Sequence, residues 1–112
     1  MLRSGDVVDV DLGVPEGREA GLKHPAVVLT AQRILDAEPS VVQVVPLTTV
    51  VRPFESEVLI DPDDANGLRE PSSAQCQHIR AVSVTRIGDV RGNVGSARLA
   101  QLREVVGLIL DL

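Results

Sequence analysis

The sequence predicts a small, mainly β-structured (α+β) domain, in which short strands curl into a barrel and one helix packs against it. Two observations carry this prediction. Short apolar runs separated by turn residues continue as far as residue 94, and an apolar stripe with helical spacing follows only after them. The chain has 112 residues, of which 44% are hydrophobic, so we expect residues 1–112 to form one domain with one core.

The first predicted strand is the clearest, because Val8, Val10 and Leu12 alternate with Asp9 and Asp11. Residues 13–24 contain several glycines and are expected to form a loop, and residues 26–29 are typical of a buried strand. The following segment is ambiguous: residues 31–35 can form a helical turn that ends before residue 39.

The middle of the chain predicts further short strands. Residues 41–45 are strongly β-prone and are expected to end at Pro46, and a strand over residues 55–60 follows Pro53. Residues 61–67 are dense in turn residues, and their aspartates favour a plain turn because the later ligands of a calcium loop are missing. Residues 75–82 and 88–94 can each hold a strand.

The C-terminal segment predicts the one convincing helix, with Ser96 as its N-cap. Arg98 and Arg103 are expected on its solvated face. Its apolar stripe consists of Leu99, Leu102, Val105, Val106, Ile109 and Leu110.

Composition limits the possible functions. The net charge of −5 argues against loose, charge-driven binding to nucleic acid but leaves room for a local basic site, and ten of the eleven basic residues are arginines, which suit phosphate. The chain has one Phe and no Trp or Tyr, so base stacking on aromatic side chains is mostly unavailable.

No membrane span or secretory segment is expected, which predicts a cytoplasmic protein. Cys76 is the only cysteine and is expected to be a buried, inert thiol.

The most informative stretch for a functional site runs from residue 18 to residue 30, where a charged, glycine-containing loop leads directly into a buried strand. Pro25 biases His24 toward an extended conformation, which places polar side chains at the rim of the sheet. Structural explanations also exist for these residues. His24 could only cap a strand end, and Glu19 could only pair with Lys23 or Arg18.

This layout resembles the MazF/PemK family of toxins over essentially the whole chain. The matching segments are Gly5 to Leu12, Gly17 to Glu19, Pro25 to Thr30, Val44 to Thr49, Gln77 to Val82 and the ending from Arg86. Each segment alone is mostly strand sequence, but they occur in the family's order and spacing. The resemblance implies an SH3-like/CcdB-like β-barrel with a C-terminal amphipathic helix.

The resemblance also implies a chemistry. The family cleaves single-stranded RNA, which can be mRNA, tRNA or rRNA, without a metal ion or other cofactor, by attack of a ribose 2′-OH on the adjacent phosphate. Transferred by position, it implies catalytic roles for Thr48 and Glu19, and His24 occupies the position of the family's catalytic arginine, with Lys23 beside it as a second candidate. The implied RNA-binding residues are Arg18, Thr49, Gln77, His78 and Arg80.

The replacement of arginine by His24 is the sharpest departure from the family. Histidine can take up or release a proton near neutral pH, which arginine hardly can, but it supplies fewer donors to phosphate. Either the roles are redistributed among Arg18, Lys23 and His24, or activity is weakened or lost. Adjacent residues of an extended segment face opposite sides, so Lys23 and His24 cannot simply replace each other. His78, in turn, stands where the family has glutamine, with Gln77 shifted by one.

Three functions follow as hypotheses. The first is a sequence-selective endoribonuclease toxin that forms a homodimer and is neutralised by a MazE-like antitoxin. The second is a CcdB-like toxin that binds gyrase without cutting RNA, and the third is an inactive relative that sequesters antitoxin. The first is favoured because the loop before residue 25 and Thr48 belong to the nuclease pattern.

Overall fold

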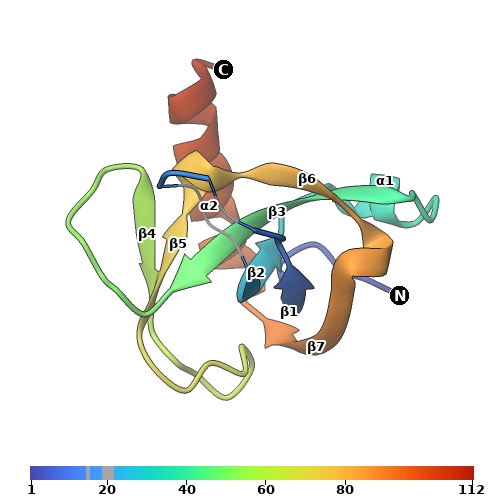
Figure 1. Ribbon diagram of the computed structural model, residues 1–112, viewed down its shortest axis with the longest axis horizontal. Coiled ribbons are helices and arrows are strands. Elements are labelled where there is room, and N and C mark those ends of the chain that lie inside the picture. The colour runs from blue at the N-terminus through green and yellow to red at the C-terminus, as the bar shows by residue number, and fades with distance from the viewer. Residues whose placement is uncertain (15, 19–21) are drawn as a thin grey trace.

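A computed structural model of the protein describes residues 1–14, 16–18 and 22–112. Within this part of the chain, strands, α-helices and short 3-10 helices (η) follow one another as Figure 1 shows. Their bounds are β1 Asp6–Asp11, β2 Lys23–Val28, α1 Gln32–Leu35, β3 Val41–Thr48, β4 Glu57–Ile60, β5 Ser72–Gln75, η1 Cys76–His78, β6 Arg80–Ser83, η2 Val84–Arg86, β7 Ile87–Asn93 and α2 Gly95–Leu110.

The strands form one curled antiparallel sheet of seven strands in the described part of the chain, which confirms the barrel-like fold. The order is β4-β5-β3-β2-β1-β7, and β6 pairs with β3 off this path. Strand β3 is shared: its first half pairs with β6 as far as Val44, and its end pairs with β5 from Leu47 onward.

Pro46 does not end β3, contrary to the sequence-based expectation, because of this exchange of neighbours. It lies between the last partner of β6 and the first partner of β5, and it remains paired with Ala26 of β2 on the other side. A proline, which cannot donate a hydrogen bond, is tolerated where one ladder has ended and the next has not begun.

The interior consists of two clusters on the two faces of the curled sheet. The first contains Val27, Val45 and Leu47 together with the buried face of α2. The second contains Ala26, Val28 and Val44, without any residue of α2. Consecutive residues of β2 and β3 therefore alternate between the clusters, as the period of a strand requires. Helix α2 also contacts β4 and η1.

Two boundary predictions were wrong. The strand expected over residues 75–82 is not continuous: β5 already ends at Gln75, η1 occupies Cys76–His78, and β6 begins at Arg80. The turn of η1 separates β5 from β6 because these two strands pair with different parts of the longer β3. Ser96 is not the N-cap: α2 begins at Gly95, whose N–H donates to the Asn93 side chain over 2.8 Å. At its other end α2 extends past the core, so Ile109 and Leu110 of the predicted stripe are 39% and 54% exposed.

The turn predicted over residues 61–67 and the exposed arginines of α2 were confirmed. Residues 61–67 form a turn in which the Asp63 carboxylate accepts hydrogen bonds from the N–H groups of Ala65 and Asn66, both over 2.8 Å. Arg98 and Arg103 are exposed on α2. Among the residues that the structure describes, no helix combines the length and apolar character needed to cross a membrane.

Candidate functional site

The strand that follows the charged loop begins earlier in the chain than the sequence indicated. Strand β2 begins at Lys23, which pairs with Asp11, and His24 pairs with Val10. The hairpin continues beyond the strand ends, because the Leu12 N–H donates to the Leu22 carbonyl over 2.8 Å. The predicted loop over residues 13–24 therefore ends two residues early, and Lys23 and His24 are both fixed in extended backbone.

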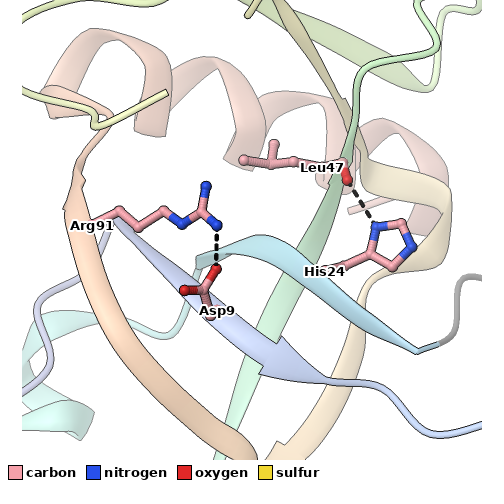
Figure 2. Close-up of polar contacts among 4 residues, drawn as sticks. All are labelled: Asp9, His24, Leu47 and Arg91. Atoms are coloured by element: carbon pink, nitrogen blue, oxygen red, sulfur yellow. Dashed lines mark hydrogen bonds and ion pairs between the residues drawn. The ribbon is translucent and has the colours of Figure 1, made fainter. Parts of the chain in front are cut away.

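His24 is held by the neighbouring strand. Its Nδ1 lies 3.2 Å from the carbonyl oxygen of Leu47 in β3. Figure 2 shows the ring turned toward this carbonyl and away from Asp9 and Arg91. A carbonyl oxygen only accepts hydrogen bonds, so Nδ1 carries the hydrogen. In the neutral ring Nε2 then has a free lone pair, which makes it the atom that can accept a proton.

Thr48 directly follows Leu47, whose carbonyl holds this imidazole. The pairing between β2 and β3 runs from Val28 with Val44 to Ala26 with Pro46, so His24 and Thr48 both lie just beyond its end. By the alternation along each strand, His24 shares a face with Ala26, and Thr48 shares a face with Val44, both residues of the second cluster. The Thr48 Oγ1 accepts a hydrogen bond from the Val50 N–H over 3.1 Å, which leaves its own hydrogen available to a ligand. Thr49 is exposed beside it.

Arg80 belongs to the same face of the sheet. It pairs with Val44 and precedes Val82 by two residues, and both valines belong to the second cluster. By the period of a strand, His24, Thr48 and Arg80 all point to the rim of that cluster. The Arg80 guanidinium donates to the Leu12 carbonyl over 3.0 Å. The sequence left open whether Arg80 reaches a carboxylate or lines a groove, and the structure places it in a groove.

That groove is a hollow of about 400 Å³, called here the basic hollow. It lies between the end of β1 and the segment from η1 to η2. It brings together three of the residues predicted to bind RNA, since Gln77, His78 and Arg80 all line it. Its complete lining is Leu12, Gly13, Val14, Gln77, His78, Ile79, Arg80 and Arg86. Gln77 also donates to Glu57 over 2.7 Å.

A second hollow of about 540 Å³, called here the mixed hollow, lies beside β1, β2 and β7. Lys23 and His24 contribute to it, together with residues of both charges. The Arg91 guanidinium forms an ion pair with Asp9 across it over 2.8 Å (Figure 2). Arg86 lines both hollows, and its guanidinium donates to the Asp11 carbonyl over 3.3 Å.

The remaining predicted residues are not gathered into either hollow. Arg18 is exposed in the loop, and Thr48 and Thr49 lie outside the described lining of both hollows. Glu19, the predicted catalytic glutamate, lies outside the residues that the structure describes. Arg86 is the residue that sequence reasoning missed. The available signal was the concentration of basic residues between positions 78 and 86 of an acidic chain.

Cys76 is the buried thiol that the sequence predicted. Its side chain is 0% exposed at the start of η1, behind the residues that line the basic hollow. Burial, with a contribution from the negative charge of Glu57, raises the pKa of the thiol to about 11. Because the thiolate is the reactive form, this cysteine is inert at neutral pH.

The fold and the site thus define a small antiparallel barrel protein with an imidazole, a threonine and arginines at one rim. The family model described as PemK-like, MazF-like toxin of type II toxin-antitoxin system matches residues 3–110, and the chain belongs to this family of toxins.

Individual relatives agree. The chain is 34% identical over 117 aligned residues to Endoribonuclease MazF9 of Mycobacterium tuberculosis, covering 100% of this chain and 98% of that protein. MazF of Deinococcus radiodurans has the same fold, with a TM-score of 0.81 and 21% identity over 97% of this chain and 96% of that one. So does a mycobacterial endoribonuclease solved with its cognate antitoxin, with a TM-score of 0.79 and 21% identity over 100% and 97% of the two chains.

Proposed function

We propose that this toxin is a sequence-selective endoribonuclease that cleaves single-stranded RNA without a metal ion. The observation that carries the proposal is the hydrogen bond from His24 to the Leu47 carbonyl, which fixes the imidazole beside the residue that precedes Thr48 at the rim of the sheet. Membership of the MazF toxins and the name of the relative with 34% identity support an RNA substrate. The same relatives do not favour the gyrase-binding alternative.

In the proposed reaction His24 is the general base. Its Nε2 removes the proton from the ribose 2′-OH, while Nδ1–H stays bonded to the Leu47 carbonyl. The 2′ oxygen forms a bond to the adjacent phosphorus and the bond from phosphorus to the 5′ oxygen breaks, which leaves a 2′,3′-cyclic phosphate. The departing 5′ oxygen takes a proton from water. Histidine can thus perform the proton transfer directly, which the arginine of the family hardly can.

The other site residues stabilise the charge on the phosphate. We assign the Thr48 hydroxyl as a donor to a non-bridging oxygen, because its lone pair already accepts from Val50. Lys23, which lines the mixed hollow together with His24, supplies a further positive charge. A role for Glu19 remains a prediction from the sequence. The contacts of Arg18, Thr49, Gln77, His78 and Arg80 with RNA are likewise proposed.

The proposal includes partners. One structural relative was solved with its cognate antitoxin, which supports a small antitoxin that neutralises this chain in the same way. We further propose that the toxin is a homodimer and acts in the cytoplasm, where its RNA substrates are.

The test is incubation of the purified protein with total RNA in EDTA, followed by sequencing of the product 5′ ends. The informative variant is His24→Asn, because the Asn amide can keep the donor to the Leu47 carbonyl while Nε2 is lost. We expect discrete cuts from the wild type and a loss of about a hundredfold or more in His24→Asn. Thr48→Val should lose activity, and Thr48→Ser, which keeps the hydroxyl, should retain most of it.

Two outcomes would contradict the proposal. Intact RNA at high protein excess, without antitoxin, would exclude a nuclease. It would favour a toxin that binds gyrase or an inactive relative that sequesters antitoxin. Full activity in a folded His24→Asn variant would show that Nε2 does not transfer the proton. A His24→Arg variant adds a further check, since it should cleave without the rise in rate with pH that a histidine base produces.

A further inference from the structure

The basic hollow has a charge unlike that of the rest of the protein. The chain carries a net charge of −5, yet the described lining of this hollow contains Arg80, Arg86 and His78 and no carboxylate. We infer that it is a phosphate subsite, in which Arg80 and Arg86 hold an uncut phosphodiester of the RNA strand beside the cleaved one. The inference rests on the proposed RNA substrate and adds Arg86 to the site.

The two guanidinium groups are positioned by the end of β1. Arg80 donates to the Leu12 carbonyl over 3.0 Å and Arg86 to the Asp11 carbonyl over 3.3 Å. Each anchor uses one N–H of a group that has five. Both guanidinium groups are therefore anchored in the lining of one hollow before a ligand arrives, so less side-chain entropy is lost when a phosphate binds.

The mixed hollow does not offer the same environment. It contains Lys23, Arg86 and Arg91, but also Asp9, Asp11 and Asp89, and Arg91 is already paired with Asp9. A phosphate there would face carboxylates at short range. The two hollows adjoin at Arg86, which lines both, and His24 lines the mixed one. An RNA strand that extends from His24 past Arg86 would therefore place its uncut phosphate in the hollow whose described lining has no carboxylate.

The direct test is the salt dependence of RNA binding. The probe is a 5′-fluorescein, random-sequence nonamer with 2′-O-methyl groups, which cannot be cut because the attacking hydroxyl is blocked. Binding is measured by anisotropy between 50 and 200 mM NaCl for wild type, Arg86→Gln, Arg86→Lys and the control Arg98→Gln. Arg98 is exposed on α2 and bonds to Gln101, away from both hollows.

We expect Arg86→Gln to weaken binding about tenfold at the lowest salt. The slope of log affinity against log salt should fall by about 0.7, the value for one phosphate contact on a single strand. Arg86→Lys should keep the slope but bind less tightly, since the charge remains and the planar fork is lost. Arg98→Gln should match the wild type.

Equal slopes for Arg86→Gln and wild type, or an equal change in Arg98→Gln, would overturn the inference. A glutamate nonapeptide serves as the second probe: if it binds more tightly than the RNA and depends more strongly on Arg86, the hollow is a site for an acidic protein segment instead. Cleavage is not needed for this readout. If the wild type cleaves RNA but Arg86→Gln leaves the slope unchanged, only the phosphate subsite is contradicted. If Arg86→Gln lowers the slope but the wild type does not cleave RNA, only the nuclease is contradicted.

Discussion

Cys76 should control how the stability of this protein changes at alkaline pH. The thiol has a pKa of about 11 in the folded protein, against 9.0 for the unperturbed group. Between these values the folded protein holds a proton that the unfolded chain has lost. The free energy of unfolding must therefore fall as the pH rises through this window. A difference of about two pKa units corresponds to about 3 kcal/mol, lost between pH 9 and pH 11.

The composition makes this effect measurable. The chain has no tyrosine, and Lys23 is its only lysine, so few other groups titrate in this pH range. Urea unfolding of the wild type and Cys76→Ala between pH 8 and pH 11 measures the slope. The variant is expected to be less stable at pH 8, because it leaves a cavity, but nearly independent of pH above it.

Glu57 provides a second check, because its negative charge contributes to the raised thiol pKa. Glu57→Gln should lower that pKa and weaken the loss of stability with pH, while the Gln side chain can still reach Ser73 and Gln77, its present partners. Parallel stability curves for wild type and Cys76→Ala over this pH range would refute the reasoning, since the decline would then come from other groups.

Three further predictions concern the fold. Leu102→Ala should cost about 2–5 kcal/mol in urea unfolding, because this side chain lies on the buried face of α2 and is 0% exposed. Gly92→Ala should strongly reduce the yield of folded protein or its melting temperature, because the new Cβ would overlap the Ala65 carbonyl oxygen, a backbone atom that cannot move freely. Asn93→Ala should cost about 1 kcal/mol through loss of the hydrogen bond that its side chain accepts from Gly95, the first residue of α2, and Ser96→Ala should cost almost nothing.

The controls lie on the same elements. Leu108→Ala, at a side chain that is 68% exposed, should change stability by less than about 0.5 kcal/mol. Gly107→Ala lies in α2 where an added Cβ meets nothing within 4 Å, and it should stabilise the helix by about 1 kcal/mol. A larger effect of Ser96→Ala than of Asn93→Ala would contradict the role of the hydrogen bond between Gly95 and Asn93, and a Leu102→Ala loss no larger than that of Leu108→Ala would contradict the packing.

Local sequence patterns predicted much of the fold. The alternation of Val8, Val10 and Leu12 predicted β1, and the apolar stripe predicted α2, because each pattern depends on the period of a single element. The same locality predicted an extended His24, next to Pro25, and a buried Cys76. The resemblance of the ordered segments to the MazF toxins named the family, which the family model confirmed.

Other features depended on partners far away in the chain. The break between β5 and β6 follows from the length of β3, whose two halves need different neighbours. The N–H of Gly95, the first residue of α2, is bound by the Asn93 side chain, which also donates to Asp6 of β1. No periodicity within residues 75–96 contains that information, so both boundaries were predicted incorrectly.

The candidate site likewise combines features that local sequence predicts with features that depend on distant parts of the chain. The sequence by itself determined which residue types are present: an imidazole before a buried strand, a threonine at the end of another, and arginines in an acidic chain. Only the tertiary structure decided that the His24 Nδ1 meets the carbonyl of Leu47, the residue before Thr48, and that Arg86 lines two hollows. The physical reason is that pairing between strands is non-local, so the curl of the sheet selects which side chains meet at its rim.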